Sequence, residues 1–157
     1  MASLLETVQQ FFADEGWVTA RSDDTTLRMS FRGDNATWTC FARVREAHGQ
    51  VVFYSVAPGS APAALRPAIA EFIARANFGM VVGNFELDFG DGEVRFRTSL
   101  ELGPDGLEGV PFARLFGRLV GTNLRMMDRY LPGLLDVLGD RAPAEALAEI
   151  DGDGAAG

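Results

Sequence analysis

The sequence predicts an α+β domain in which an antiparallel β-sheet is flanked by helices. Apolar residues recur at helical spacing in three segments and alternate with polar residues in the stretches between them. The order is helix, three or four strands, helix, two strands and one or more helices, which disfavours a doubly wound parallel sheet. With 157 residues the chain can bury a core without disulfides or metals. We expect one domain over residues 1–150 and an acidic, glycine-rich flexible tail at 151–157.

The first helix is predicted to begin after Ser3, because Ser3 and Glu6 have the spacing of a capping box. Gly16 ends this helix, and residues 17–20 are interpreted as a short strand. Asp34-Asn35 then suits a two-residue turn, because both residues tolerate positive φ. The resulting hairpin places apolar residues opposite each other: Phe31 with Trp38, Met29 with Cys40, and Leu27 with Ala42.

A third strand is expected at 37–46, and His48-Gly49 turns the chain into a fourth strand at 51–56. An amphipathic helix follows over residues 65–76. Asp91-Gly92 then predicts a second hairpin, whose two faces agree on one register. In that register Phe89 faces Val94, Leu87 faces Phe96, Asp88 meets Arg95 and Glu86 meets Arg97.

The C-terminal part of the chain is predicted to be helical. One apolar stripe runs from residue 112 to 138. Pro132 is expected to kink or break this helix, because proline lacks the N–H that the helix needs. Gly139 ends it, and residues 143–150 suit one further short helix.

Composition excludes several functions. The 14 basic and 22 acidic residues give a net charge of −8, which argues against direct binding to nucleic acid or to a membrane surface. All basic residues are arginine, so lysine-dependent Schiff-base chemistry and P-loop phosphate transfer are excluded. One Cys and one His exclude a Cys/His zinc cage and an intrachain disulfide. No signal peptide or spanning segment is visible, and we expect a cytoplasmic protein with no cofactor or metal.

The negative charge is concentrated in the second half of the chain. Residues 1–80 carry −1 and residues 81–157 carry −7, of which −5 lies after residue 135. An acidic C-terminal end steers basic partners toward it. Such partners include proteins that themselves bind nucleic acid.

Two segments carry a resemblance to a known family. The first spans 77–100, with Asn77, Gly-x-Phe-Glu-x-Asp at 83–88, Asp-Gly-Glu at 91–93 and Arg-Phe-Arg at 95–97; the second spans 123–132. Both resemble the YbjN family of bacterial proteins. The resemblance implies a fold similar to type III secretion chaperones, which are small, acidic, usually homodimeric proteins that bind segments of client proteins. It implies no catalytic residue.

The chemistry-bearing residues each have a structural interpretation. Asp88, Asp91 and Glu93 form a compact acidic group, but they lack the remaining ligands of a calcium loop. His48 is expected to be exposed in a turn, without the oriented partner that a general base needs. Cys40 is interpreted as a small core residue of a central strand. An enzyme would require two or more of Asp88, Asp91, Glu93, Glu86 and Arg97 to converge in a cleft.

The sequence therefore predicts a non-catalytic protein-binding module that acts as a homodimeric, chaperone-like adaptor or regulator. The helix at 65–76 has more apolar surface than one sheet face requires, and an exposed portion of it would form a dimer or client interface. Arginines at one edge of the long helix are candidate anchors for acidic client groups. The candidate interface residues are Leu65, Ile69, Phe72, Ile73, Arg118, Arg125 and Arg129. The alternative function is a small-molecule-sensing regulatory domain with a pocket between sheet and helices.

Overall fold

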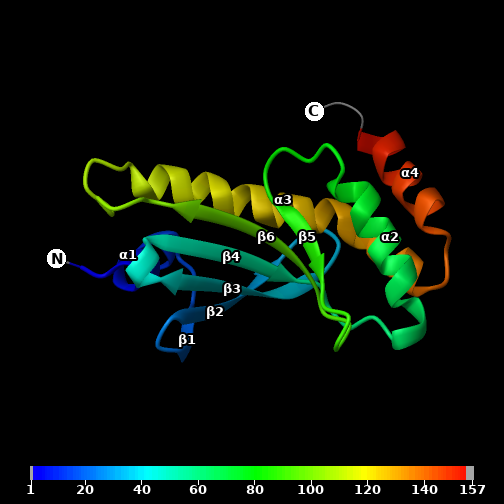
Figure 1. Ribbon diagram of the computed structural model, residues 1–157, viewed down its shortest axis with the longest axis horizontal. Coiled ribbons are helices and arrows are strands. Elements are labelled where there is room, and N and C mark those ends of the chain that lie inside the picture. Colours follow the sequence, from blue (N-terminus) through cyan, green and yellow to red (C-terminus); the bar gives the residue numbers. More distant parts are fainter. Residues whose placement is uncertain (1, 155–157) are drawn as a thin grey trace.

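The computed structural model describes residues 2–154, which form four α-helices and a six-stranded antiparallel sheet (Figure 1). The helices are α1 (Leu4–Asp14), α2 (Arg66–Asn77), α3 (Phe112–Leu138) and α4 (Pro143–Gly154). The strands are β1 (Ala20–Asp23), β2 (Thr26–Arg32), β3 (Thr37–Arg45), β4 (Gln50–Val56), β5 (Asn84–Leu87) and β6 (Val94–Glu101). They lie in the spatial order β1-β2-β3-β4-β6-β5. The predicted α+β class and the order of elements are confirmed.

Helices cover one face of the sheet. Alternate residues of β2, β3, β4 and β6 are buried on that face, where α1 and α3 pack. In Figure 1, α3 passes behind β5 and β6, whereas α2 and α4 lie together at the end of the molecule near β5. Within residues 2–154 no helix packs on the opposite face of the sheet, so its outward side chains are available for contacts.

The capping box of α1 forms as predicted. Glu6 N–H donates to Ser3 Oγ at 3.1 Å, and Ser3 N–H donates to Glu6 Oε2 at 2.8 Å. The strand expected at residues 17–20 begins later, at Ala20. Trp17 does not pair in the sheet, because its N–H donates to Phe12 O at 2.8 Å and closes the end of the helix.

The predicted register of the first hairpin is confirmed. Phe31 lies opposite Trp38, Met29 opposite Cys40 and Leu27 opposite Ala42. Gly33 N–H donates to Ala36 O, so Asp34-Asn35 are the two central residues of the turn. The reason expected for this turn, positive φ at Asp34 and Asn35, does not apply. Among the described residues only Asp140 and glycines have positive φ.

The turn is instead held by α3. The Asp128 carboxylate accepts hydrogen bonds from Asp34 N–H at 2.9 Å and Asn35 N–H at 3.0 Å. Asn35 Nδ2 in return donates to the Asp128 carbonyl oxygen at 2.8 Å. That carbonyl is the one that Pro132 leaves without its helical donor. The predicted break at Pro132 is therefore wrong, and α3 continues through it.

The predicted register of the second hairpin is wrong by two residues. Phe85 lies opposite Phe96 and Leu87 opposite Val94, so the loop spans residues 88–93. The loop is longer because the Asp88 and Asp91 side chains accept hydrogen bonds from Gly90 N–H and Glu93 N–H. Ala61 N–H also donates to Gly92 O at 2.8 Å, which holds this loop against the segment before α2.

The last helix is longer than predicted. α4 extends to Gly154, so residues 151–154 of the expected tail are helical, and residues 155–157 lie outside the described part of the chain. Ala146 is buried, and α4 packs against both α2 and α3. This packing covers the apolar face of α2 that was predicted to be an interface.

Candidate functional site

The apolar face predicted to be an interface on α2 is buried. Ile69, Phe72 and Ile73 belong to the core, and Leu65 is half-buried. The helix α4 covers this face, and Ile150 approaches Gly133 of α3 close to the ring of Phe72. The expectation that these α2 side chains form an exposed surface is therefore wrong. The apolar surface of α2 that exceeds what the sheet requires packs against α4.

An exposed apolar loop follows α2 directly. Phe78 is 91% exposed and Val81 is 95% exposed, and Val82 is 50% exposed. In Figure 1 the loop joining α2 to β5 arches away from the sheet beside α3. Gly79 and Gly83 have φ near +80°, which lets the chain reverse twice and hold these side chains outward. The sequence signal for this loop was the apolar run between two glycines, and we name residues 78–82 the apolar loop.

The apolar loop adjoins a hollow on α3. The hollow measures about 360 Å³ and is lined by Phe78, Met80, Val82, Met126 and others. Arg125 is exposed and donates from Nη2 to Thr122, which also lines the hollow. One arginine side chain thus lies at the edge of this hollow.

The three arginines predicted on α3 share its exposed side. Arg118, Arg125 and Arg129 are all exposed. Arg125 and Arg129 are four residues apart, and Arg118 precedes Arg125 by seven residues, about two helical turns. Arg129 also lies over the ring of Tyr130 at 5.6 Å. Arg125 lies next to the apolar loop, whereas the predicted α2 residues lie in the core. The structure therefore separates the two groups that were expected to form one interface.

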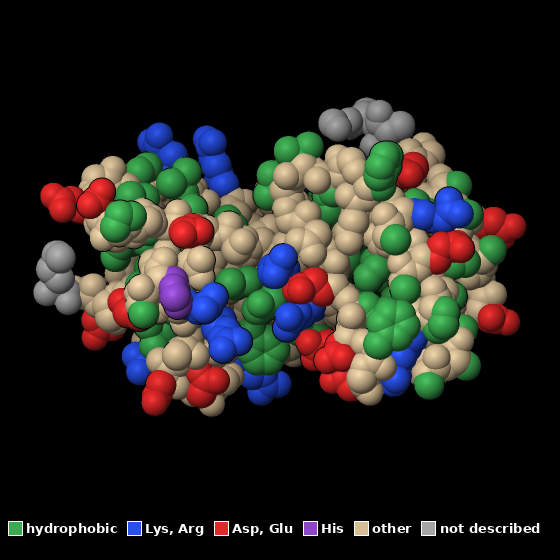
Figure 2. Space-filling view, in the orientation of Figure 1, with side chains coloured by type: hydrophobic (Ala, Val, Ile, Leu, Met, Phe, Trp, Pro, Cys, Tyr) green, Lys and Arg blue, Asp and Glu red, His purple; other side chains and the backbone are tan. Residues whose placement is uncertain are grey.

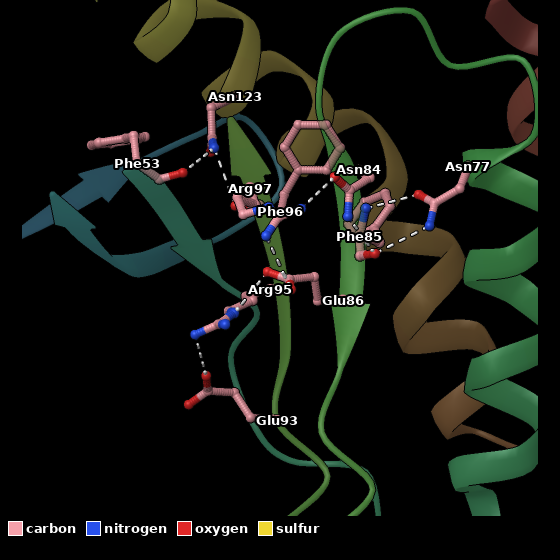
Figure 3. A network of polar contacts seen from close by, with 10 residues as sticks. All are labelled: Phe53, Asn77, Asn84, Phe85, Glu86, Glu93, Arg95, Phe96, Arg97 and Asn123. Carbon is pink, nitrogen blue, oxygen red and sulfur yellow. Dashed lines mark hydrogen bonds and ion pairs between the residues drawn. The ribbon is translucent and has the colours of Figure 1, made fainter. Parts of the chain in front are cut away.

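A buried polar cluster joins α3 to the sheet (Figure 3). Asn123 Nδ2 donates to Phe53 O at 2.9 Å and to Phe96 O at 3.1 Å, and its Oδ1 accepts from Ser55 Oγ at 2.6 Å. Thr98 Oγ1 also accepts from Asn123 at 3.2 Å. These groups are satisfied by each other, so the cluster orients α3 rather than offering a reactive site.

The acidic and basic residues of the second hairpin pair at its surface (Figure 3). Glu86 lies 3.1 Å from Arg95 Nε and 3.7 Å from Arg97 Nη1, and Glu93 lies 4.0 Å from Arg95. Asn77 from α2 bonds both backbone groups of Phe85, which fastens β5. The expected pairing of Asp88 with Arg95 is wrong, because the register differs by two residues. Glu86 and Glu93 are held in these surface ion pairs, and the Asp88 and Asp91 side chains accept backbone hydrogen bonds of the loop.

The remaining candidate residues are His48 and Cys40. No group of three His, Cys, Asp or Glu side chains among residues 2–154 is arranged to hold a metal ion. His48 is exposed, as predicted. Cys40 is buried as predicted, and burial raises the pKa of its thiol to about 12, so the unreactive thiol form predominates. No described helix is long and apolar enough to cross a bilayer.

An open antiparallel sheet with helices packed on one face defines an α+β domain. The chain belongs to the YbjN family, whose model matches residues 4–136 and is described as "Putative bacterial sensory transduction regulator". The predicted family is therefore confirmed. The matched range ends before α4.

Solved structures with the same fold support this assignment. The crystal structure of YbjN from E. coli has a TM-score of 0.57 and 16% identity, over 79% of this chain and 85% of that chain. The ExsC–ExsE complex has a TM-score of 0.50 and 13% identity, over 83% and 98%. A Methanothermobacter thermautotrophicus protein has the same score and identity, over 87% and 97%. No curated protein matches significantly. The predicted likeness to type III secretion chaperones is confirmed as a fold.

Proposed function

We propose that the chain is a non-catalytic protein-binding module, a chaperone-like adaptor or regulator that binds a segment of a client protein. The observation that carries the proposal is the apolar loop, in which Phe78 and Val81 are more than nine-tenths exposed. Burying two such side chains contributes about 1.5–3 kcal/mol each, so leaving both in water indicates a partner. The structure of the ExsC–ExsE complex, which has a similar fold, supports the proposal.

The client segment is apolar with acidic flanks. The apolar loop and the adjoining hollow on α3 contact its apolar residues. Arg118, Arg125 and Arg129 stand along the exposed side of the same helix and bind its carboxylates, for which guanidinium groups are suited. The acidic C-terminal end lies on α4 and favours approach by a basic region of the client. We further propose that the module acts as a homodimer in the cytoplasm.

The test compares two matched double variants. Phe78→Ser with Val81→Ser removes one Phe and one Val from the apolar loop. Phe89→Ser with Val18→Ser removes the same two residue types from exposed positions elsewhere. Proteins captured from lysate by the immobilised wild type are identified, purified and titrated against all three forms. We expect the apolar-loop variant to bind at least about tenfold more weakly and the control to bind normally.

Two results would contradict the proposal. Equal binding by the wild type and the apolar-loop variant would show that the loop does not contact the client. Equal weakening by both double variants would show a nonspecific response to lost apolar surface. Circular dichroism spectra that match the wild type establish that each variant is folded.

A second candidate function is small-molecule sensing. A hollow of about 640 Å³ lies between the start of α1, the β3–β4 turn and residues 102–108, and its size suits a small ligand. Leu4, Leu102 and Leu107 give it apolar walls. A metabolite that raises the melting temperature of the wild type but not of Leu107→Glu would support this function. The absence of any such metabolite in a broad screen would count against it.

A further inference from the structure

The sheet face without helices is basic, although the chain as a whole is acidic. Six arginines and two glutamates project from this face, from the four strands β2, β3, β5 and β6. They are Arg28, Arg32, Arg43, Arg45, Arg95, Arg97, Glu86 and Glu101. Figure 2 shows arginine side chains gathered over the middle of the sheet. We name these eight residues, together with Val52 and Tyr54 of β4, the basic sheet face.

Four arginines of this face have no acidic partner among the described residues. Arg95 and Arg97 pair with Glu86, whereas Arg28, Arg32, Arg43 and Arg45 form no ion pair within residues 2–154. Arg43 lies diagonally across from Arg28, because Arg28 pairs with Phe41 two residues away. Such neighbours are about 7–8 Å apart, and like charges at this range repel. In a chain with 22 acidic residues, an unneutralised cluster of arginines indicates a site for an anionic partner.

The arginines line a hollow on the sheet. It measures about 480 Å³ and is lined by Arg43, Arg45, Arg97, Val52 and Tyr54 with others. The guanidinium of Arg95 lies 4.1 Å from the centre of the Tyr54 ring and covers it. A ligand here therefore meets mainly guanidinium and other polar groups, with Val52 between them.

We propose that the basic sheet face binds a short, extended acidic segment of a partner protein. Arg43 and Arg45 leave the same face of β3 two residues apart, so their spacing along the strand is about 6.6–6.8 Å. An extended segment with a carboxylate at every second residue has the same repeat, and each guanidinium can bind a carboxylate with two hydrogen bonds. The carboxylates then all face the sheet and the residues between them face solvent, because successive side chains of an extended segment point to opposite sides. This surface lies across the sheet from α3 and is additional to the proposed function.

A nucleic acid fits this face less well than a short peptide. The net charge of −8 means that the rest of the molecule is strongly negative, and a long polyanion that leaves the arginine cluster is repelled. Single-stranded nucleic acid also needs open aromatic rings for its bases, whereas Arg95 already covers Tyr54. A short segment confines its charge to the arginines.

Fluorescence anisotropy with defined probes tests the proposal. The probe is a labelled peptide of about ten residues in which Glu alternates with Val, and the comparison probe has Gln in place of Glu. An oligothymidylate of similar length is the third probe. Arg43→Ser with Arg45→Ser removes the cluster, and Arg21→Ser with Arg75→Ser removes the same charge from other exposed positions. We expect the cluster variant to bind the Glu probe at least about tenfold more weakly, and the control variant to bind it normally.

Each alternative result has a defined meaning. Equal weakening by both variants would overturn the proposal, because only net charge would matter. Equal binding of the Gln probe would also overturn it, and tighter binding of oligothymidylate would assign the face to nucleic acid. Self-association of the wild type that the cluster variant abolishes would assign the face to a second copy of the chain. Phe78→Ser with Val81→Ser is expected to bind the Glu probe normally, so this test is independent of the proposed client surface.

Discussion

At the residue scale, one aspartate links the first hairpin to the longest helix. Asp128 accepts two backbone N–H groups of the turn, and its own carbonyl accepts the Asn35 side chain. Gly33 allows the close approach, because a Cβ there would lie 2.6 Å from Asp128 Oδ1 and 2.7 Å from the Trp38 ring. The link satisfies the carbonyl that Pro132 leaves unbonded, so the proline is tolerated in a continuous helix.

Replacing Asp128 by alanine is expected to lower the free energy of unfolding by about 1–3 kcal/mol, because two backbone N–H groups lose a charged acceptor. Asp136→Ala is the matched control on the same helix. Its carboxylate pairs with the exposed Arg141, and exposed pairs contribute little, so we expect little change. Urea denaturation of both variants measures the difference. Equal stability of Asp128→Ala and the wild type would show that the link does not stabilise the fold.

Cys40 predicts a pH dependence of stability. Burial raises the pKa of its thiol to about 12 in the folded protein, whereas an unfolded thiol has a pKa near 8.5. The unfolded state therefore loses its proton first as the pH rises. The stabilisation from the neutral thiol is complete below about pH 8.5 and is lost progressively toward pH 12.

Between about pH 8.5 and 10.5 the wild type is expected to lose stability more steeply than Cys40→Ala, with a limiting difference of about 1.4 kcal/mol per pH unit. Urea midpoints at several pH values give both slopes. Because alanine also removes volume from the core, the comparison uses slopes rather than absolute stabilities. Parallel slopes would show that the thiol has no such effect.

At the element scale, the sequence predicted local pairing better than contacts between distant elements. The first hairpin was correct because three apolar pairs agreed on its register. The predicted register of the second hairpin was wrong by two residues, because the Asp88 and Asp91 side chains accept hydrogen bonds that lengthen its loop. Composition alone does not distinguish this longer loop from a two-residue turn. The apolar face of α2 was recognised correctly. Whether solvent, a partner or α4 covers it depends on long-range packing that the local pattern does not contain.

The contact of α4 with α2 and α3 depends on Gly133. A Cβ at this position would lie 2.5 Å from Ile150 Cδ1 and 2.8 Å from the Phe72 ring. Gly133→Ala is therefore expected to lower the free energy of unfolding by about 1–3 kcal/mol, because overpacking outweighs the better helix propensity of alanine. Urea denaturation measures this change.

Gly117→Ala is the control within the same helix. A Cβ there would lie 3.5 Å from the Phe11 ring, an ordinary contact, so propensity should dominate and stability should stay level or rise by up to about 1 kcal/mol. If both alanine variants changed stability by the same amount, the packing of α4 on Gly133 would not be a determinant of the fold.

At the scale of the whole molecule, the arrangement of charge matters more than its sum. The net charge of −8 indicated an acidic protein, and the sequence located most of the excess in the second half. It did not show that six arginines share one sheet face, because β6 is far along the chain from the hairpin of β2 and β3. The molecule thus has an acidic C-terminal end, a basic sheet face and an apolar loop beside α3. These surfaces differ in chemistry and suit contacts with more than one partner or region.

The proposed homodimer makes a prediction about mass and salt. Light scattering at micromolar concentration is expected to give twice the chain mass of 16.9 kDa. A closed dimer held by apolar contacts should keep this mass between about 0.05 and about 0.5 M NaCl, because salt screens charge but does not weaken apolar contacts. Association of the acidic end of one copy with the basic sheet face of the next would instead build open chains, whose mass grows with concentration and falls with salt. A single species of 16.9 kDa would remove the homodimer from the proposed function, while leaving the client surface of a monomer to be tested by the apolar-loop variant.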